Sequence, residues 1–106
     1  MADAKSEIYE LNRIGAKPQK NSGRGAFAKG DGVLGPFCVD IKESIKSFTL
    51  SRDVWTKITG DARQSGNLSP ALKVVLGGAE DVKLRMVIID ESMFLEMYEA
   101  WRLANG

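Results

Sequence analysis

Four side chains of this sequence have the types and spacing of a metal-dependent hydrolytic site. Glu7, Asp31 and Asp40 supply carboxylates, and Lys42 follows Asp40 two positions along the chain. Carboxylate oxygens are ligands that Mg²⁺ prefers, and an ammonium beside the metal steadies an attacking water or hydroxide. This combination suits phosphodiester cleavage, with Mg²⁺ as the expected ion and Mn²⁺ as the alternative.

The acidic-x-lysine tripeptide occurs three times, so its setting must decide which copy belongs to a site. The copy at Asp3–Lys5 lies close to the N-terminus, where chains commonly fray. The copy at Asp81–Lys83 opens a hairpin strand and has no obvious acidic partner in a preceding turn. The copy at Asp40–Lys42 lies on a strand, and we therefore place the site there.

The alternation of apolar and polar residues over 37–42 predicts a β-strand with Asp40 and Lys42 on one face. Gly35-Pro36 marks a turn just before this strand. Two antiparallel strands folded at that turn would bring residue 31 close to residue 40. The sequence therefore predicts that Asp31 and Asp40 face a common metal ion.

The first helix, predicted over 4–14 from apolar residues at helical spacing, offers two carboxylates. On the helical wheel Glu7 falls within the apolar arc, whereas Glu10 falls outside it. A carboxylate on a core-facing stripe is costly unless it is paired or binds a metal, which favours Glu7 as the site residue. The alternative is a partly exposed Glu7 that pairs with Lys5 or Arg13.

The composition excludes several other classes of site. The 106 residues include no histidine and a single cysteine, Cys38, which excludes His-based zinc sites, Ser-His and Cys-His nucleophile pairs and an internal disulfide. The length fits one domain, residues 1–106, and no apolar run approaches the ~20 residues of a membrane span. Because the N-terminus lacks the apolar core of a secretory signal, we expect a cytoplasmic protein without a membrane partner.

Basic residues are concentrated near the expected site. Residues 1–30 contain six basic and three acidic side chains, a net charge of +3, whereas the remainder contains nine basic and eleven acidic ones, a net charge of −2. A phosphate backbone would favour this bias, although an ordinary solvated surface explains it about equally well. In the glycine-rich loop predicted over 21–32, Ser22, Arg24 and Lys29 are candidates for contacts to DNA phosphates, with a solvated turn as the alternative.

The remaining patterns predict an α/β fold with the element order α-β-β-β-α-β-β-α. Ser51 is the expected N-cap of the second helix and Asp90 that of the third. Gly77–Asp81 is expected to join the last two strands into a hairpin. The expected elements after the first helix are strands at 17–20, 37–42 and 47–50, a helix ending at about residue 63, strands at 71–76 and 82–89, and a final helix.

The final helix carries an apolar stripe made of Phe94, Met97, Tyr98 and Trp101 on one face. Two interpretations fit such a stripe. It either packs into the core of its own chain, or it forms an interface between two subunits.

Several of these segments together resemble the PD-(D/E)xK nuclease superfamily, specifically its small phage-encoded Holliday junction resolvase-like endonucleases. Glu7, Asn21–Gly23, Lys29–Asp31 and Val39–Ser44 carry the resemblance. Further similarity, which extends over most of residues 7–94, lies at Trp55-x-Lys57-Ile58, Asp61-Ala62, Pro70–Leu72 and Met86–Ile89. Gly30 stands in place of the proline of the superfamily's name, and Asp40 stands where many relatives carry glutamate.

The resemblance implies a restriction-endonuclease-like core, with a central mixed β-sheet flanked by helices. It also implies a magnesium site in which the matching positions are Glu7, Asp31, Asp40 and Lys42, with Ser22 nearby. In the mechanism that we expect, Asp31, Asp40 and the carbonyl of Ile41 hold Mg²⁺, and Glu7 binds a second ion or a metal-bound water. Lys42 then orients or helps to deprotonate the attacking water.

The leading hypothesis is a magnesium-dependent DNA endonuclease that acts on branched DNA as a two-fold homodimer, because cutting a four-way junction needs two sites at a fixed separation. A structure-insensitive nickase or flap nuclease with the same site is the alternative within the enzyme class. A DNA-binding module without turnover is the alternative outside it. The resemblance alone suggests a phage protein that acts in the cytoplasm of the infected bacterial host.

Overall fold

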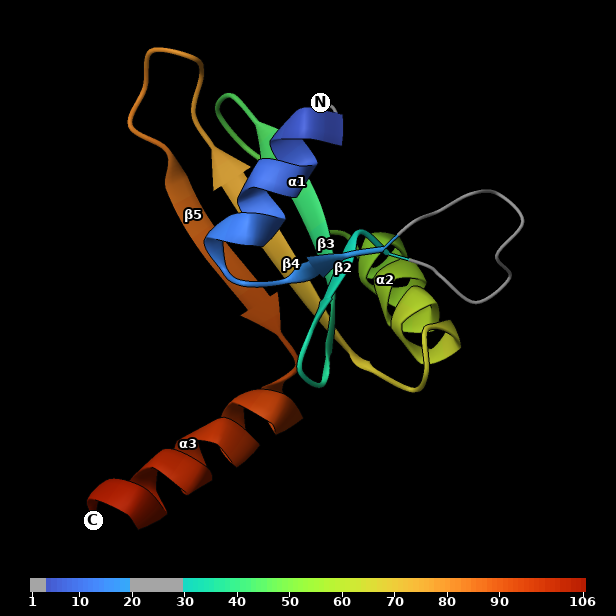
Figure 1. Ribbon diagram of the computed structural model, residues 1–106, viewed down its shortest axis with the longest axis vertical. Helices are drawn as coiled ribbons and strands as arrows, with labels where there is room; N and C mark the ends of the chain where they lie inside the picture. Colours follow the sequence, from blue (N-terminus) through green and yellow to red (C-terminus); the bar gives the residue numbers. More distant parts are fainter. Residues whose placement is uncertain (1–3, 20–29) are drawn as a thin grey trace.

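The computed structural model describes residues 4–19 and 30–106, which form an α/β fold built on a five-stranded mixed sheet (Figure 1). The observed order of elements is the predicted α-β-β-β-α-β-β-α. The elements are α1 (Ala4–Arg13), β1 (Lys17–Pro18), β2 (Gly32–Leu34), β3 (Phe37–Ser44), α2 (Arg52–Gln64), β4 (Ser69–Leu76), β5 (Leu84–Ile89) and α3 (Glu91–Asn105).

The strands lie in the sheet in their chain order, β1-β2-β3-β4-β5. Only β3 and β4 are parallel, and every other neighbouring pair is antiparallel. A parallel pair needs a crossover connection, and here α2 provides it. The predicted turn at Gly35-Pro36 joins β2 to β3, and Gly35 has a φ of +54°, a conformation that glycine adopts without steric cost.

Two apolar clusters cover the two faces of the sheet. On one face, α1 contributes Leu11, which packs with Val39 and Ile41 of β3. On the other face, α2 contributes Ile58, which packs against Leu72 and Val74 of β4. Because side chains alternate along a strand, Cys38, Asp40 and Lys42 of β3 lie on the α2 face.

One predicted strand is wrong. Residues 47–50 form no strand, and β2 takes the third strand position instead. Both edges of β3 are already paired, with β2 and β4. The chain therefore leaves the sheet after Ser44, and Phe48 packs into the cluster under α2.

The predicted start of α2 at Ser51 is confirmed, because the Ser51 hydroxyl accepts a hydrogen bond from the Val54 amide at 3.2 Å. Asp90 occupies the N-cap position of α3 without a side-chain capping hydrogen bond.

The buried carboxylate of α1 is Glu10, so the helical-wheel prediction that placed Glu10 outside the buried arc is wrong. Glu10 is 2% exposed, whereas Ile8, the reference of the predicted apolar arc, is 48% exposed. The Glu10 carboxylate lies 2.7 Å from the Lys73 ammonium and 2.9 Å from Nε of Arg85. The Lys73 ammonium also donates to the Glu10 carbonyl at 2.8 Å. Partners on β4 and β5 therefore make this burial tolerable.

Candidate active site

The β2–β3 hairpin brings Asp31 and Asp40 together, as the turn at Gly35-Pro36 predicted. The hairpin pairs Gly32 with Val39, and the Asp31 amide donates to the Val39 carbonyl at 3.0 Å. The Asp31 carboxylate then accepts the Ile41 amide at 2.7 Å. Asp31 is thus held against the backbone on both sides of Asp40, which fixes the position of its carboxylate.

The Asp40 carboxylate is partly buried and incompletely hydrogen-bonded. Its Oδ2 atom is buried and has no hydrogen-bond partner among the described residues. Burial, together with the charges of Asp31 and Asp61, raises the pKa of Asp40 to about 6. A cation beside this oxygen would supply the missing partner and relieve the repulsion between the carboxylates.

Gly30 allows the chain to pass close to this carboxylate. A Cβ atom at position 30 would lie 2.5 Å from the Cys38 sulfur and 3.7 Å from Oδ2 of Asp40. Gly30 also has a φ of +82°, whereas a proline ring fixes φ near −65°. This backbone therefore requires glycine at position 30.

Lys42 lies on the same face of β3 as Asp40, two residues further along, and its side chain is exposed. Its positive charge is close enough to oppose the rise in the pKa of Asp40. Within residues 4–19 and 30–106 this ammonium has no ion-pair partner, so it can reach a phosphate or a water beside the carboxylates.

Two residues of α2, Lys57 and Asp61, extend this group of charges and were not among the predicted site residues. α2 returns from the end of β3 to the start of β4, so it runs antiparallel to β3. Its C-cap Ser65 lies 3.9 Å from Cys38, hydroxyl oxygen to sulfur, which places Asp61, one turn earlier, alongside Asp40. Lys57 pairs with Asp61 at 3.1 Å, and the charges of both affect the pKa of Asp40. Their i,i+4 spacing was the available signal in the sequence.

The role of Glu7 as a site residue stays a prediction. α1 covers the opposite face of the sheet, where Leu11 packs on Val39 and Ile41. The neighbour of Glu7, Ser6, donates from its hydroxyl to the Glu43 carboxylate at 2.5 Å, and Glu43 shares that opposite face. Among residues 4–19 and 30–106, no three acidic, histidine or cysteine side chains converge with the spacing of metal ligands. The structure places Asp31 and Lys42 beside Asp40.

The predicted DNA contacts Ser22, Arg24 and Lys29 lie outside the described residues, and their role stays a prediction. The carbonyl of Ile41 as a metal ligand also stays a prediction.

Asp40→Asn is expected to stabilise the metal-free protein at alkaline pH. The pKa of Asp40 rises from the ordinary 3.8 to about 6 on folding. The folded state therefore binds the proton of the Asp40 carboxyl more tightly than the unfolded state does. The resulting contribution to stability is complete below pH 3.8 and is lost as the pH rises through 6. A difference of about two pH units corresponds to about 3 kcal/mol. The advantage of the variant in free energy of unfolding should therefore grow from near zero at pH 4 to about 3 kcal/mol at pH 8.

Urea unfolding at both pH values in EDTA measures this advantage. Asp53→Asn, at an exposed aspartate of α2, is the matched control and should show no comparable gain. An Asp40→Asn variant whose advantage does not grow with pH would contradict the environment described for this carboxylate.

Comparison of the chain with protein-family models, curated proteins and solved structures gives no match. Within the described ranges, no helix has both the length and the apolar character needed to cross a membrane.

Proposed function

We propose that this chain is a magnesium-dependent endonuclease that hydrolyses DNA phosphodiester bonds, with branched DNA of the Holliday junction type as its substrate. The observation that carries the proposal is the buried, unpartnered Oδ2 of Asp40 beside the fixed carboxylate of Asp31. Lys42 follows on the same face. Two carboxylates and a lysine on one strand-turn-strand unit supply the groups that metal-assisted phosphodiester hydrolysis needs.

Each residue has a distinct part in this proposal. Asp31, Asp40 and the carbonyl of Ile41 would hold the ion, with Mn²⁺ as the substitute for Mg²⁺. When bound, the ion polarises the phosphate and lowers the pKa of water. Lys42 orients the attacking water and offsets the charge that develops on the phosphate oxygens. Glu7 would bind a second ion or a metal-bound water.

The proposal includes two copies of the chain. A four-way junction offers two equivalent strands for cleavage, and a two-fold homodimer presents two identical sites at a fixed separation. Ser22, Arg24 and Lys29 are the proposed contacts to the phosphate backbone on either side of the cut.

The test is cleavage of a synthetic four-way junction, a flap and a linear duplex of matched sequence while Mg²⁺ is titrated from zero. Junction cleavage that requires the ion, with slower cutting of the duplex, supports the proposal. Equal cutting of all three substrates identifies a structure-insensitive nickase. Binding without cleavage at any Mg²⁺ or Mn²⁺ concentration identifies a DNA-binding module and refutes the enzyme.

Lys57 is expected to contact a DNA phosphate next to the carboxylate pair, because its ammonium is exposed and held by Asp61. Lys57→Ala should weaken junction binding and reduce the slope of log affinity against log salt by about 1, the value for one phosphate contact. Fluorescence anisotropy without divalent ions measures this slope apart from catalysis. Arg63→Ala, at an exposed basic residue on a different side of α2, is the control and should leave the slope unchanged. An unchanged slope in Lys57→Ala would remove Lys57 from the interface.

A further inference from the structure

The helix α2 contains a glycine, Gly60, that the fold itself does not explain. Glycine inside a helix is less stable than alanine, because its backbone loses more conformational freedom on folding. A Cβ atom at position 60 would meet no heavy atom within 4 Å among the described residues, so no packing contact excludes a side chain. The backbone there is ordinary helix without a positive φ. The missing side chain therefore leaves open space on the outer surface of α2.

Gly60 lies at the height of the Asp40 carboxylate. α2 runs antiparallel to β3, and its C-cap Ser65 lies 3.9 Å from Cys38, hydroxyl oxygen to sulfur. Gly60 precedes Ser65 by five residues, about 7.5 Å along the helix axis. Asp40 follows Cys38 by two residues, about 7 Å along the strand. The open space on α2 is therefore level with the candidate site.

Exposed lysines of α2 and β3 lie one step further along the same direction. Lys57 precedes Gly60 by three residues, which places both on one side of α2, and its side chain is 78% exposed. Lys42 is exposed on the α2 face of β3. From the contact between α2 and β3 at Ser65, Lys57 is about 12 Å away along the helix and Lys42 about 13 Å away along the strand. Two positive charges at one height suit an anionic polymer.

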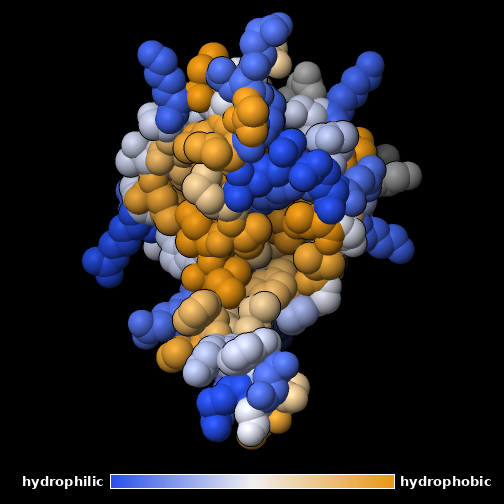
Figure 2. All heavy atoms as spheres, turned by 90° about the vertical axis from the view of Figure 1, so that its left-hand side faces the viewer, coloured by the Kyte–Doolittle hydropathy of each residue, from blue (hydrophilic) through white to orange (hydrophobic). Residues whose placement is uncertain are grey.

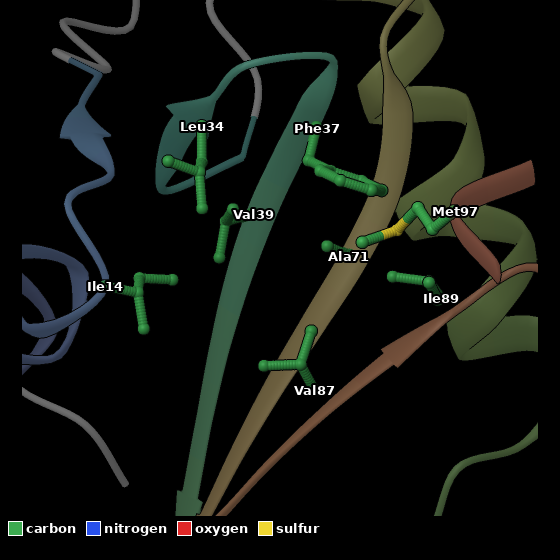
Figure 3. A pocket seen from close by; sticks show the side chains of 8 residues that line it. All are labelled: Ile14, Leu34, Phe37, Val39, Ala71, Val87, Ile89 and Met97. Atoms are coloured by element: carbon green, nitrogen blue, oxygen red, sulfur yellow. The ribbon is translucent and has the colours of Figure 1, made fainter. Parts of the chain in front are cut away.

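The outer surface of α2 is polar, whereas the exposed apolar surface lies elsewhere. None of the large apolar side chains that are exposed in the described ranges belongs to α2. Apolar surface instead continues from the body of the molecule towards α3 (Figure 2), where a hollow of about 290 Å³ is lined by the side chains shown in Figure 3. Val39, Ala71 and Ile89 of this lining belong to the cluster on the α1 face of the sheet. The α2 surface therefore has the composition of a contact to a charged ligand, because the cores of protein interfaces are depleted of charge.

The apolar stripe of α3 lies apart from α2 as well. α3 projects from the body of the molecule after β5 (Figure 1), and none of its residues is buried. Phe94, Met97, Tyr98 and Trp101 are between 48% and 60% exposed. In the described structure the stripe is therefore not part of the core of its own chain, and its interpretation as a subunit interface stays a prediction.

We infer that the sugar-phosphate backbone of the DNA strand lies directly on α2 at Gly60, where no side chain holds it away from the helix. Glycine lets a ligand approach the protein backbone closely. The strand that contacts Lys57 through a phosphate then passes Gly60 at the height of Asp40. The inference rests on the proposed function and names the surface that positions DNA at its site.

Two substitutions that add a side chain at this position test the inference. Gly60→Ala and Gly60→Gln should both raise the urea midpoint of unfolding, because alanine and glutamine favour a helix more than glycine does. Gly60→Gln should nevertheless weaken binding of a synthetic four-way junction by about tenfold, the order expected for the loss of one hydrogen bond to a charged group. Fluorescence anisotropy without divalent ions measures this affinity. Ala100→Gln, at an exposed position of α3, is the matched control and should bind the junction like the wild type.

A double-mutant cycle with Lys57→Ala tests whether one strand contacts both positions. Gly60→Gln should then weaken binding less in the Lys57→Ala background than in the wild type, because changes that share a partner are not additive. Additive losses overturn the inference.

The remaining outcomes separate this inference from the proposed function. Unchanged junction affinity in Gly60→Gln overturns the inference and leaves the proposed function standing, whereas a wild type without affinity for junction, flap or duplex refutes both. Sedimentation equilibrium without DNA addresses the other occupant of this surface. Loss of self-association in Gly60→Gln would assign the surface to a contact between two copies of the chain and overturn the DNA contact.

Discussion

Lys42→Ala and Asp31→Asn are expected to abolish magnesium-dependent junction cleavage while junction binding survives. Lys42 is exposed on the face of β3 that carries Asp40, so its removal leaves the fold intact and takes away the ammonium beside the reacting phosphate. Losses of about 10²–10⁴-fold in rate are typical for a group that assists proton transfer. Asp31→Asn keeps an oxygen that can accept the Ile41 amide but removes the negative charge that binds the ion.

Single-turnover cleavage with saturating Mg²⁺ measures the rate, and anisotropy in EDTA measures binding. Lys46→Ala, at an exposed lysine four residues beyond Lys42, is the matched control for loss of a positive charge near the end of β3. If either site variant cuts at the rate of the wild type, the assignment of the site to this hairpin is wrong. Loss of cleavage together with loss of binding would instead give these residues a role in DNA contact.

The part of the site that could be predicted from the sequence is the part built by local geometry. A short Gly-Pro turn and the alternation of β3 fix the register of a hairpin, and this register alone brings Asp31 to Asp40. Lys57 and Asp61 reach the same place through the α2 crossover. Their position follows only once β3 and β4 are known to be parallel neighbours, because such crossovers have a fixed hand.

Two predictions were wrong, the exposed position of Glu10 and the strand at residues 47–50, and both failed because of long-range contacts. The helical wheel assumes that buried positions are apolar, yet Glu10 is buried because Lys73 and Arg85, 63 and 75 residues away, supply opposite charges. Residues 47–50 have the composition of a strand, but the sheet edges beside β3 are already filled. In both cases long-range contacts decide the outcome, and a local pattern carries no information about them.

Glu10→Leu is expected to cost about 3–5 kcal/mol of the free energy of unfolding, because it leaves the Lys73 ammonium buried without its counter-charge. Lys73 is 1% exposed, so water cannot replace the lost carboxylate. Lys73→Met should cost less, since Glu10 keeps both hydrogen bonds from Arg85, at 2.9 and 3.1 Å. Urea unfolding at pH 7 measures each change.

The double variant Glu10→Leu with Lys73→Met decides whether the cost comes from an uncompensated charge or from lost packing. Replacing both partners of a buried ion pair by apolar groups is often close to neutral, so the double variant should recover most of the stability that Glu10→Leu loses. If it is less stable than either single variant, the charge interpretation is wrong.

The pH dependence of the stability gives an independent check on the Glu10 carboxylate. Burial alone would raise the pKa of Glu10, but the hydrogen bonds and charges of Arg85 and Lys73 outweigh burial and hold it below its ordinary value. The carboxylate therefore contributes stability above its unfolded-state pKa, and this contribution is lost as the pH falls through the folded-state pKa. The double variant lacks the carboxylate and should lose less stability than the wild type on acidification.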